Sequence, residues 1–246
     1  MLGILNSEVM KKIILIIFLL STVTSFGCSC SQLRLTNAFS GIEFIGIIKF
    51  TSLKKVSDFE EFYKVEYEVI EQFVGNKKTE LFIESQESSS CSFIPEINFE
   101  YFILAYKNEN GFLVTSFCLA KNIPTFKVLS ILREVTKANI HKNTTQNIIQ
   151  YTKEKLNTNL FKKEIKGALI YEVNLNSNLE VTNLKPYNDK AKNNFNKRIK
   201  KELRDKFRYK KMNKELKIKG ENFKVFIVLN WIENYKRKLV IETTKI

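Results

Sequence analysis

The chain has 246 residues, with 40 Lys and Arg against 26 Asp and Glu, and a formal net charge of +14. That length suits one large domain or two small ones, and the absence of internal repeats and low-complexity tracts excludes repeat architectures. The charge is uneven, because residues 28–123 carry a net −4 and residues 124–246 a net +17. We therefore predict two parts, with the boundary in segment 121–125, where Pro124 disfavours helix in the residue before it.

The N-terminal segment has the layout of a secretory signal peptide. A basic pair, Lys11 and Lys12, precedes an apolar core at 13–20 and then small and polar residues. This core is shorter than the about 20 residues that span a bilayer. We predict that residues 1–27 are removed and that the mature chain starts at Cys28. A lipoprotein signal that acylates Cys28, or an uncleaved anchor, is the alternative. Each places the chain in the periplasm, the cell envelope or the medium, where disulfides persist.

The number and spacing of the cysteines predict two disulfides. The chain has four cysteines, and an even number in an exported protein argues for complete pairing. Cys28 and Cys30 are poor partners for each other, because residues i and i+2 of an extended segment have Cα atoms roughly 6–7 Å apart, the limit for a bridge. Two pairings with Cys91 and Cys118 stay open: 28–91 with 30–118, or 28–118 with 30–91. A zinc site would usually show two close cysteine pairs or several histidines, and His141 is the only histidine, so we expect no metal and no cofactor.

Alternating apolar and charged residues predict β-strands in residues 28–123. In 62–74, for example, Val65 and Tyr67 face one way and Glu66 and Glu68 the other. The pattern also predicts strands at 43–50, 79–85, 99–106 and 112–118, the last two forming a hairpin around the Gly-containing "KNENG". Five short strands without long helices predict a small barrel or sandwich.

Four segments of this half carry a family resemblance: "CSC" at 28–30, "AFSGIEFIGIIKF" at 38–50, "SSSCSF" at 88–93 and "YFILAYKNENGFLVTSFC" at 101–118. In this order they resemble the netrin-like domain, and within it the tissue inhibitors of metalloproteinases, over about residues 28–120. The resemblance implies a five-stranded OB-type β-barrel with the pairing Cys28–Cys91 and Cys30–Cys118. The family inhibitors carry a third disulfide in this domain, for which this chain has no cysteines.

The resemblance also implies a candidate site at the mature N-terminus. In the family inhibitors, the α-amino group and first carbonyl of the N-terminal cysteine chelate the protease zinc, and the second residue enters the specificity pocket. By position, these contacts fall to Cys28 and Ser29, with Cys30 as the clamp. The competing interpretation, which we favour, is that the motif only fixes the N-terminal segment to the barrel of a non-catalytic binding protein. The partner would then be a metalloproteinase or another extracytoplasmic protein.

The basic half predicts a helical connector, residues 124–164, followed by a basic α+β domain, residues 165–246. Helices are expected at 127–140 and 145–161, strands at 167–176, 179–185 and 223–233, and a helix at 188–207. That last helix has an apolar residue at every fourth position: Ala191, Phe195, Ile199, Leu203 and Phe207. The order β-β-α-β predicts a two-layer domain. It is loosely similar, over about residues 165–235, to the C-terminal domain of the energy-transducing TonB proteins.

A dense basic run lies in this domain. Residues 197–220 contain 12 basic and 3 acidic side chains. We predict that Lys197, Arg198, Lys200, Lys201 and Arg204 contact an anionic envelope surface, against the alternative of a solvated face that keeps the protein soluble. Export argues against nucleic acid as the partner.

Catalytic signatures are absent from the sequence, which has no HExxH, GxSxG, Walker or dinucleotide-binding motif. His141 is expected at a helix end, where it can interact with the last carbonyls, and Trp231 in the core of a sheet. We therefore expect binding rather than an enzymatic activity.

Overall fold

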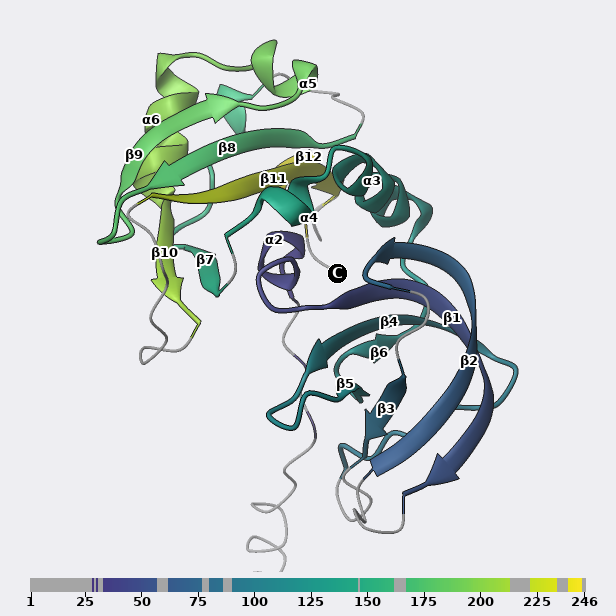
Figure 1. Cartoon of the computed structure of the whole chain (residues 1–246). Coiled ribbons are helices and arrows are strands. Elements are labelled where there is room, and N and C mark those ends of the chain that lie inside the picture. The colour runs from purple at the N-terminus through teal and green to yellow at the C-terminus, as the bar shows by residue number, and fades with distance from the viewer. Residues whose placement is uncertain are drawn as a thin grey trace, which may run out of the picture.

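The computed structural model describes residues 28, 30, 33–56, 62–76, 80–85, 90–145, 147–161, 167–212, 222–233 and 239–244. The predicted signal peptide lies outside these residues. The fold is mixed, with a β-barrel in the N-terminal half and small antiparallel sheets with short helices after it (Figure 1). Within the described ranges, no helix is both long and apolar enough to cross a membrane.

The barrel is built from β1 (Phe44–Lys55), β2 (Phe62–Val74), β3 (Leu81–Glu84), β4 (Glu100–Lys107) and β5 (Leu113–Ser116). These strands pair in the order β1-β2-β3-β5-β4, and pairing of β1 with β4 closes the barrel. The β3–β5 pair is parallel and the other pairs are antiparallel, while the short β6 (Ala120–Lys121) adds to β4. The predicted five-stranded barrel and its hairpin are therefore confirmed.

Closure of the barrel depends on the bending of β1. Its pairing with β2 shifts register at three places, two of them beside Gly46 and Ile48. A Cβ atom at Gly46 would lie 2.9 Å from the carbonyl oxygen of Glu71 on β2, closer than real Cβ contacts, so only glycine fits here. The interior is filled by the barrel core: Phe44, Ile48, Phe50, Val65, Leu81, Ile83, Ile103, Ala105, Leu113 and Ala120.

The C-terminal half contains α3 (Phe126–Lys137), α4 (Ile140–Asn143), β7 (Ile148–Thr152), the 3-10 turn η1 (Thr158–Leu160), β8 (Leu169–Leu175), β9 (Val181–Pro186), α5 (Asp189–Lys192), α6 (Lys197–Lys206), β10 (Phe207–Lys211), β11 (Phe223–Glu233) and β12 (Leu239–Thr243). One sheet has the order β12-β11-β8-β9, and β7 pairs with β10 in a second sheet. The predicted strand pair before the basic helix and the strand after it are confirmed as β8, β9 and β11.

The predicted helix at 145–161 is wrong. Residues 148–152 form β7, which pairs along its full length with β10. The sequence "IIQYT" has three β-branched residues, Ile148, Ile149 and Thr152, and one tyrosine, and all four favour a pleated strand. The hydrogen-bonding partner, β10, lies far away in the sequence, so helical periodicity in a local window could not reveal it.

The predicted single helix at 188–207 is also wrong, because it is broken between α5 and α6. The Asn194 side chain donates to the carbonyl of Lys190, and the Asn196 side chain accepts from the amide of Ile199 as a new N-cap. Asparagine favours such caps over helix interiors. Phe207, the last residue of the predicted apolar stripe, begins β10.

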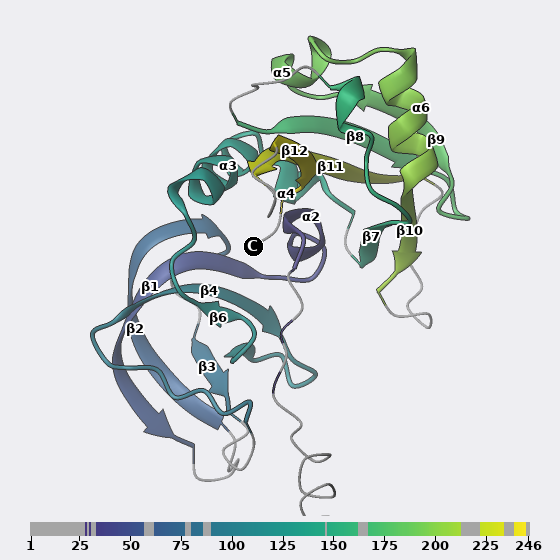
Figure 2. The ribbon, with the colours of Figure 1, turned by 180° about the vertical axis from the view of Figure 1, so that it is seen from behind.

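The sheet formed by β8 and β11 buries both of its faces. One face belongs to the C-terminal core, which includes Trp231 as predicted: Ile148, Phe161, Leu169, Tyr171, Val173, Leu175, Leu184, Ala191, Ile199, Leu203, Phe207, Tyr209, Phe223, Val225, Ile227, Leu229 and Trp231. The opposite face contributes Ala168, Ile170, Phe226 and Val228 to a core that also contains residues of β1, β2, β4, α3, α4 and α2 (Leu35–Ala38). We call this second group the shared core. In Figure 2, α2, α3 and α4 lie between the barrel and this sheet.

Candidate functional site: the disulfide-anchored N-terminal segment

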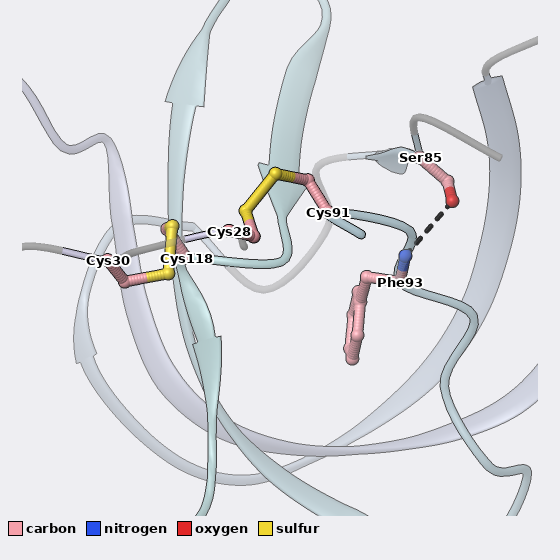
Figure 3. The surroundings of a disulfide bond; sticks show 6 residues. All are labelled: Cys28, Cys30, Ser85, Cys91, Phe93 and Cys118. Atoms are coloured by element: carbon pink, nitrogen blue, oxygen red, sulfur yellow. Dashed lines mark hydrogen bonds between the residues drawn. A yellow bond between two sulfur atoms is a disulfide. The ribbon is translucent and has the colours of Figure 1, made fainter. Parts of the chain in front are cut away.

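Two disulfides fix the N-terminal end of the described chain to the barrel. Cys28 is bonded to Cys91 with Cα atoms 5.2 Å apart, and Cys30 to Cys118 with Cα atoms 5.3 Å apart. Figure 3 shows the two bonds side by side, one reaching the loop before β4 and the other the turn after β5. This is the pairing that the family resemblance implies, and two disulfides indicate an oxidising, extracytoplasmic location.

The loop that carries Cys91 is itself anchored to the barrel. The buried Ser85 hydroxyl, just after β3, accepts a hydrogen bond of 3.1 Å from the backbone amide of Phe93 (Figure 3). The Phe93 ring packs edge-on against Tyr101, with ring centroids 5.7 Å apart. The Tyr101 hydroxyl accepts from the amide of Glu96, and the amide of Asn98 donates to a carbonyl of β1. These contacts tie the loop to the barrel at β1, at β4 and just after β3.

Large apolar side chains on this loop are left exposed. Ile94, Ile97 and Phe99 are 55%, 42% and 50% exposed, and Phe117, beside Cys118, is 37% exposed. The Phe99 ring packs edge-on against Tyr101 and still keeps half of its surface exposed. Because contacts with the barrel anchor the loop, its exposed side chains provide apolar area that a partner protein could bury.

The segment after Cys30 is held by β7 of the C-terminal half. Arg34 donates to the carbonyl of Gln150 and to the hydroxyl of Thr152, both at 3.0 Å. Asn37 exchanges two hydrogen bonds with the backbone of Gln150, and the buried Ser40 hydroxyl donates to the carbonyl of Ile148 at 2.8 Å. Burial lowers the pKa of the Arg34 guanidinium from its ordinary value. The N-terminal segment is thus fixed covalently to the barrel and by hydrogen bonds to β7.

The other predicted site residues fall in different places. Ser29, the predicted pocket residue, lies outside the described residues. The five basic candidates, Lys197, Arg198, Lys200, Lys201 and Arg204, are exposed on α6. Since α6 packs on the face of the C-terminal sheet away from the barrel, the structure does not bring them to the disulfides (Figures 1 and 2).

The single histidine lies in α4, between the barrel and the C-terminal sheet. Its Nδ1 atom is buried without a hydrogen-bond partner, and its ring centroid is 6.1 Å from that of Phe39. Burial, and then the neighbouring Lys142, lower the pKa of His141. In the described part of the chain, no group of three or more His, Cys, Asp or Glu side chains could hold a metal ion.

Sequence reasoning missed the side chains that fix both ends of the site. Arg34, Asn37 and Ser40 recur every third residue, a spacing that places them on one face of a helical turn, but a helix of four residues leaves no clear periodic pattern. Ser85 and Tyr101 act through contacts with a distant loop, for which one sequence carries no local pattern.

No family model matches the chain, and no curated protein matches it either.

Proposed function

We propose that the protein is an exported, non-catalytic binding protein whose barrel recognises another extracytoplasmic protein. The recognition surface is the disulfide-edge surface, which we define as Cys28, Cys30, Ile94, Ile97 and Phe99. One observation carries the proposal: the loop that presents the exposed apolar side chains is the loop that holds Cys28 through Cys91. Cys28 and the apolar loop are therefore covalently linked.

The energetics favour recognition of a protein by this surface. A partner that buries Ile94 and Ile97 would gain from their apolar area without ordering the loop, because Ser85 and Tyr101 already hold it. Such preorganisation lowers the entropic cost of association. Exposed large apolar side chains are typical of surfaces that bind other proteins.

Site-specific photo-crosslinking in the source cells tests this proposal. A photoreactive residue at Ile97 should give an adduct of defined mass, which mass spectrometry then identifies. The matched control carries the same residue at Ser130, an exposed position on α3. An adduct from position 97 that is absent from position 130 supports the surface. No adduct at position 97, or the same adducts at both positions, would contradict it.

A second candidate function is inhibition of a zinc metalloproteinase. It rests on the position of Cys28, whose side chain is bonded to the barrel two residues before a second bonded cysteine. If the mature chain starts there, its α-amino group and first carbonyl are held in place. The family resemblance implies that these atoms chelate the protease zinc.

One added residue separates the two functions. A chain with an extra alanine before Cys28 loses the free cysteine α-amino group but keeps both disulfides, and it should no longer inhibit secreted zinc metalloproteinases. The same alanine added after Ile246 is the control and should leave inhibition intact. Inhibition that survives the N-terminal extension would rule out zinc chelation by Cys28, while crosslinking at Ile97 would still test the first function.

The lipoprotein alternative draws less support. An acyl thioether would need the Cys28 sulfur, which is bonded to Cys91. Lipidation would also leave Cys91 unpaired in an oxidising compartment. We therefore propose that the exported protein carries no lipid at Cys28.

A further inference from the structure

The exposed face of α6 is mainly cationic, with Asp205 as its one exposed acidic residue. Ile199 and Leu203 are 1% and 0% exposed and pack into the C-terminal core. At 3.6 residues per turn, Lys197, Lys201 and Arg204 follow one another along the opposite side of the helix. Arg198 and Lys200 flank this line, and both are exposed. These five side chains are the cationic face.

Most of the cationic face is not neutralised within the described structure. Other basic residues of the C-terminal half form ion pairs: Lys185 and Lys224 with Glu172, Lys190 with Glu134, Lys192 with Asp189, and Lys206 with Glu154. None of the ion pairs found among the described residues involves Lys197, Arg198, Lys200 or Lys201. Arg204 donates to the neutral carbonyl of Val181 and is likewise absent from the ion pairs found among the described residues.

The position of these charges works against the helix itself. The first turn of α6 contains Lys197, Arg198 and Lys200 and no acidic residue, whereas the first turn of α5 begins with Asp189. Cations near a helix N-terminus oppose the helix dipole and destabilise the helix. Basic residues that weaken their own helix without any gain in packing point to a functional constraint at these positions.

We propose that the cationic face adsorbs the exported protein onto an anionic phospholipid surface. The disulfides place the chain outside the cytoplasm, which argues for lipid phosphate over nucleic acid. Phe207 is buried and Phe195 packs against the C-terminal core, so neither offers an exposed ring on which bases could stack. Because the apolar side of α6 is also buried, contact is electrostatic and leaves the bilayer core unpenetrated.

This interaction is independent of the proposed function. The apolar side of α6 packs on the C-terminal core, and α6 lies on the side of the C-terminal sheet away from the barrel (Figures 1 and 2). A protein bound at the disulfide-edge surface and a lipid surface bound at α6 would therefore not compete. Failure of one proposal leaves the other standing.

Co-sedimentation of the full, oxidised mature chain with vesicles tests the proposal. The vesicles contain phosphatidylcholine with or without phosphatidylglycerol, at low and at high salt. Binding should require phosphatidylglycerol and weaken steeply with salt, because screening acts on exposed charges. The triple variant Lys197→Gln, Lys200→Gln, Lys201→Gln should lower the partition coefficient by about 100-fold, since each basic residue near an anionic surface contributes about fivefold.

The matched control is the triple variant Lys127→Gln, Lys137→Gln, Lys142→Gln, which removes the same charge from exposed positions on α3 and α4. It should keep most of the binding. The α6 variant should melt no lower than the parent chain, because it relieves the unfavourable first turn. Retained folding with lost binding therefore supports the cationic face.

Four results would overturn the proposal. These are absence of binding to phosphatidylglycerol vesicles, equal loss in both triple variants, tighter binding to duplex DNA than to vesicles at the same salt, and displacement from vesicles by inorganic phosphate at a matched phosphate concentration. Equal loss would assign binding to the overall positive charge of the mature chain. Displacement by phosphate would mean a site for a single anion.

Discussion

The Asn37 side chain and the Gln150 backbone exchange two hydrogen bonds. The Asn37 side-chain amide donates to the backbone carbonyl of Gln150 at 3.0 Å, and the Asn37 side-chain oxygen accepts from the backbone amide of Gln150 at 2.9 Å. The side chain thus pairs with β7 as a neighbouring strand would, on the edge that β10 leaves open. Gln150 is 3% exposed, so water cannot easily replace these bonds. This contact joins the segment after the disulfides to the C-terminal half.

Replacing Asn37 with alanine should lower the free energy of unfolding by about 1–3 kcal/mol, because it leaves the buried amide of Gln150 unpaired. Urea denaturation of the oxidised protein measures this change. Asn183→Ala, at an exposed position on the edge strand β9, is the control and should shift stability by less than about 0.5 kcal/mol. Equal effects of the two substitutions would mean that the contact between Asn37 and Gln150 contributes nothing to stability.

The shared core predicts that both halves unfold together. Phe226 is 1% exposed, lies in the shared core and packs edge-on against Tyr187. Phe226→Ala should destabilise the whole chain by about 3–5 kcal/mol. Fluorescence of Trp231, the only tryptophan, follows the C-terminal half, while far-UV circular dichroism follows both halves. The two signals should shift together in one transition.

Phe126→Ala serves as the matched control, because Phe126 is 79% exposed and should tolerate the same truncation. Two separate transitions, with the barrel signal unmoved by Phe226→Ala, would show that the halves fold independently.

How far the sequence predicts this structure depends on where each element finds its partners. The barrel strands, and also β8, β9 and β11, show either alternating apolar and polar residues or a continuous apolar run within a short window. The hairpin turn between β4 and β5 is likewise set by residues that are neighbours in the sequence. β7 and β10 are five residues each and pair only with one another across a long stretch of chain. For such strands, the strand conformation depends on a pairing partner far away in the sequence, so the neighbouring residues alone do not predict it.

Phe207 shows a second limit. It continues the four-residue spacing of Ile199 and Leu203, but it starts a strand. All three side chains are buried in the C-terminal core, so the stripe correctly predicted burial while the helix ended one residue earlier. At the candidate site, the cysteine spacing left two pairings open, and the order of motifs in the family resemblance, rather than the geometry of a CxC, selected the observed one.

The disulfide map is directly testable. Proteolysis of the unreduced native protein should give peptides that link Cys28 to Cys91 and Cys30 to Cys118, with no acyl mass on Cys28. Replacing both members of one pair with serine should cost about 4 kcal/mol, because each bond closes a loop of more than sixty residues in the unfolded chain. A Cys28–Cys118 link, a lipid on Cys28 or four reduced thiols in the native protein would contradict the proposed site and its compartment.

The single histidine predicts a pH dependence that can be assigned to one residue. Burial, and then Lys142, lower the pKa of His141 from its ordinary value of 6.5, so the unfolded chain takes up a proton at pH values where the folded chain does not. The stability linked to this residue is therefore fully present above pH 6.5 and is lost as the pH falls through the lowered pKa of the folded state. Acidification within this range should favour unfolding.

Urea denaturation at about pH 7.5 and about pH 5.5, on either side of the ordinary histidine pKa, measures the effect. His141→Gln should remove this part of the pH dependence, and it breaks no hydrogen bond at Nδ1, because that atom has no partner. Lys142→Gln should keep the sign of the dependence but reduce its size, since burial is the larger cause and remains in place. An NMR titration of the only imidazole gives its pKa directly, and a value at or above 6.5 would mean that the ring is more hydrated than its position between the barrel and the C-terminal sheet allows.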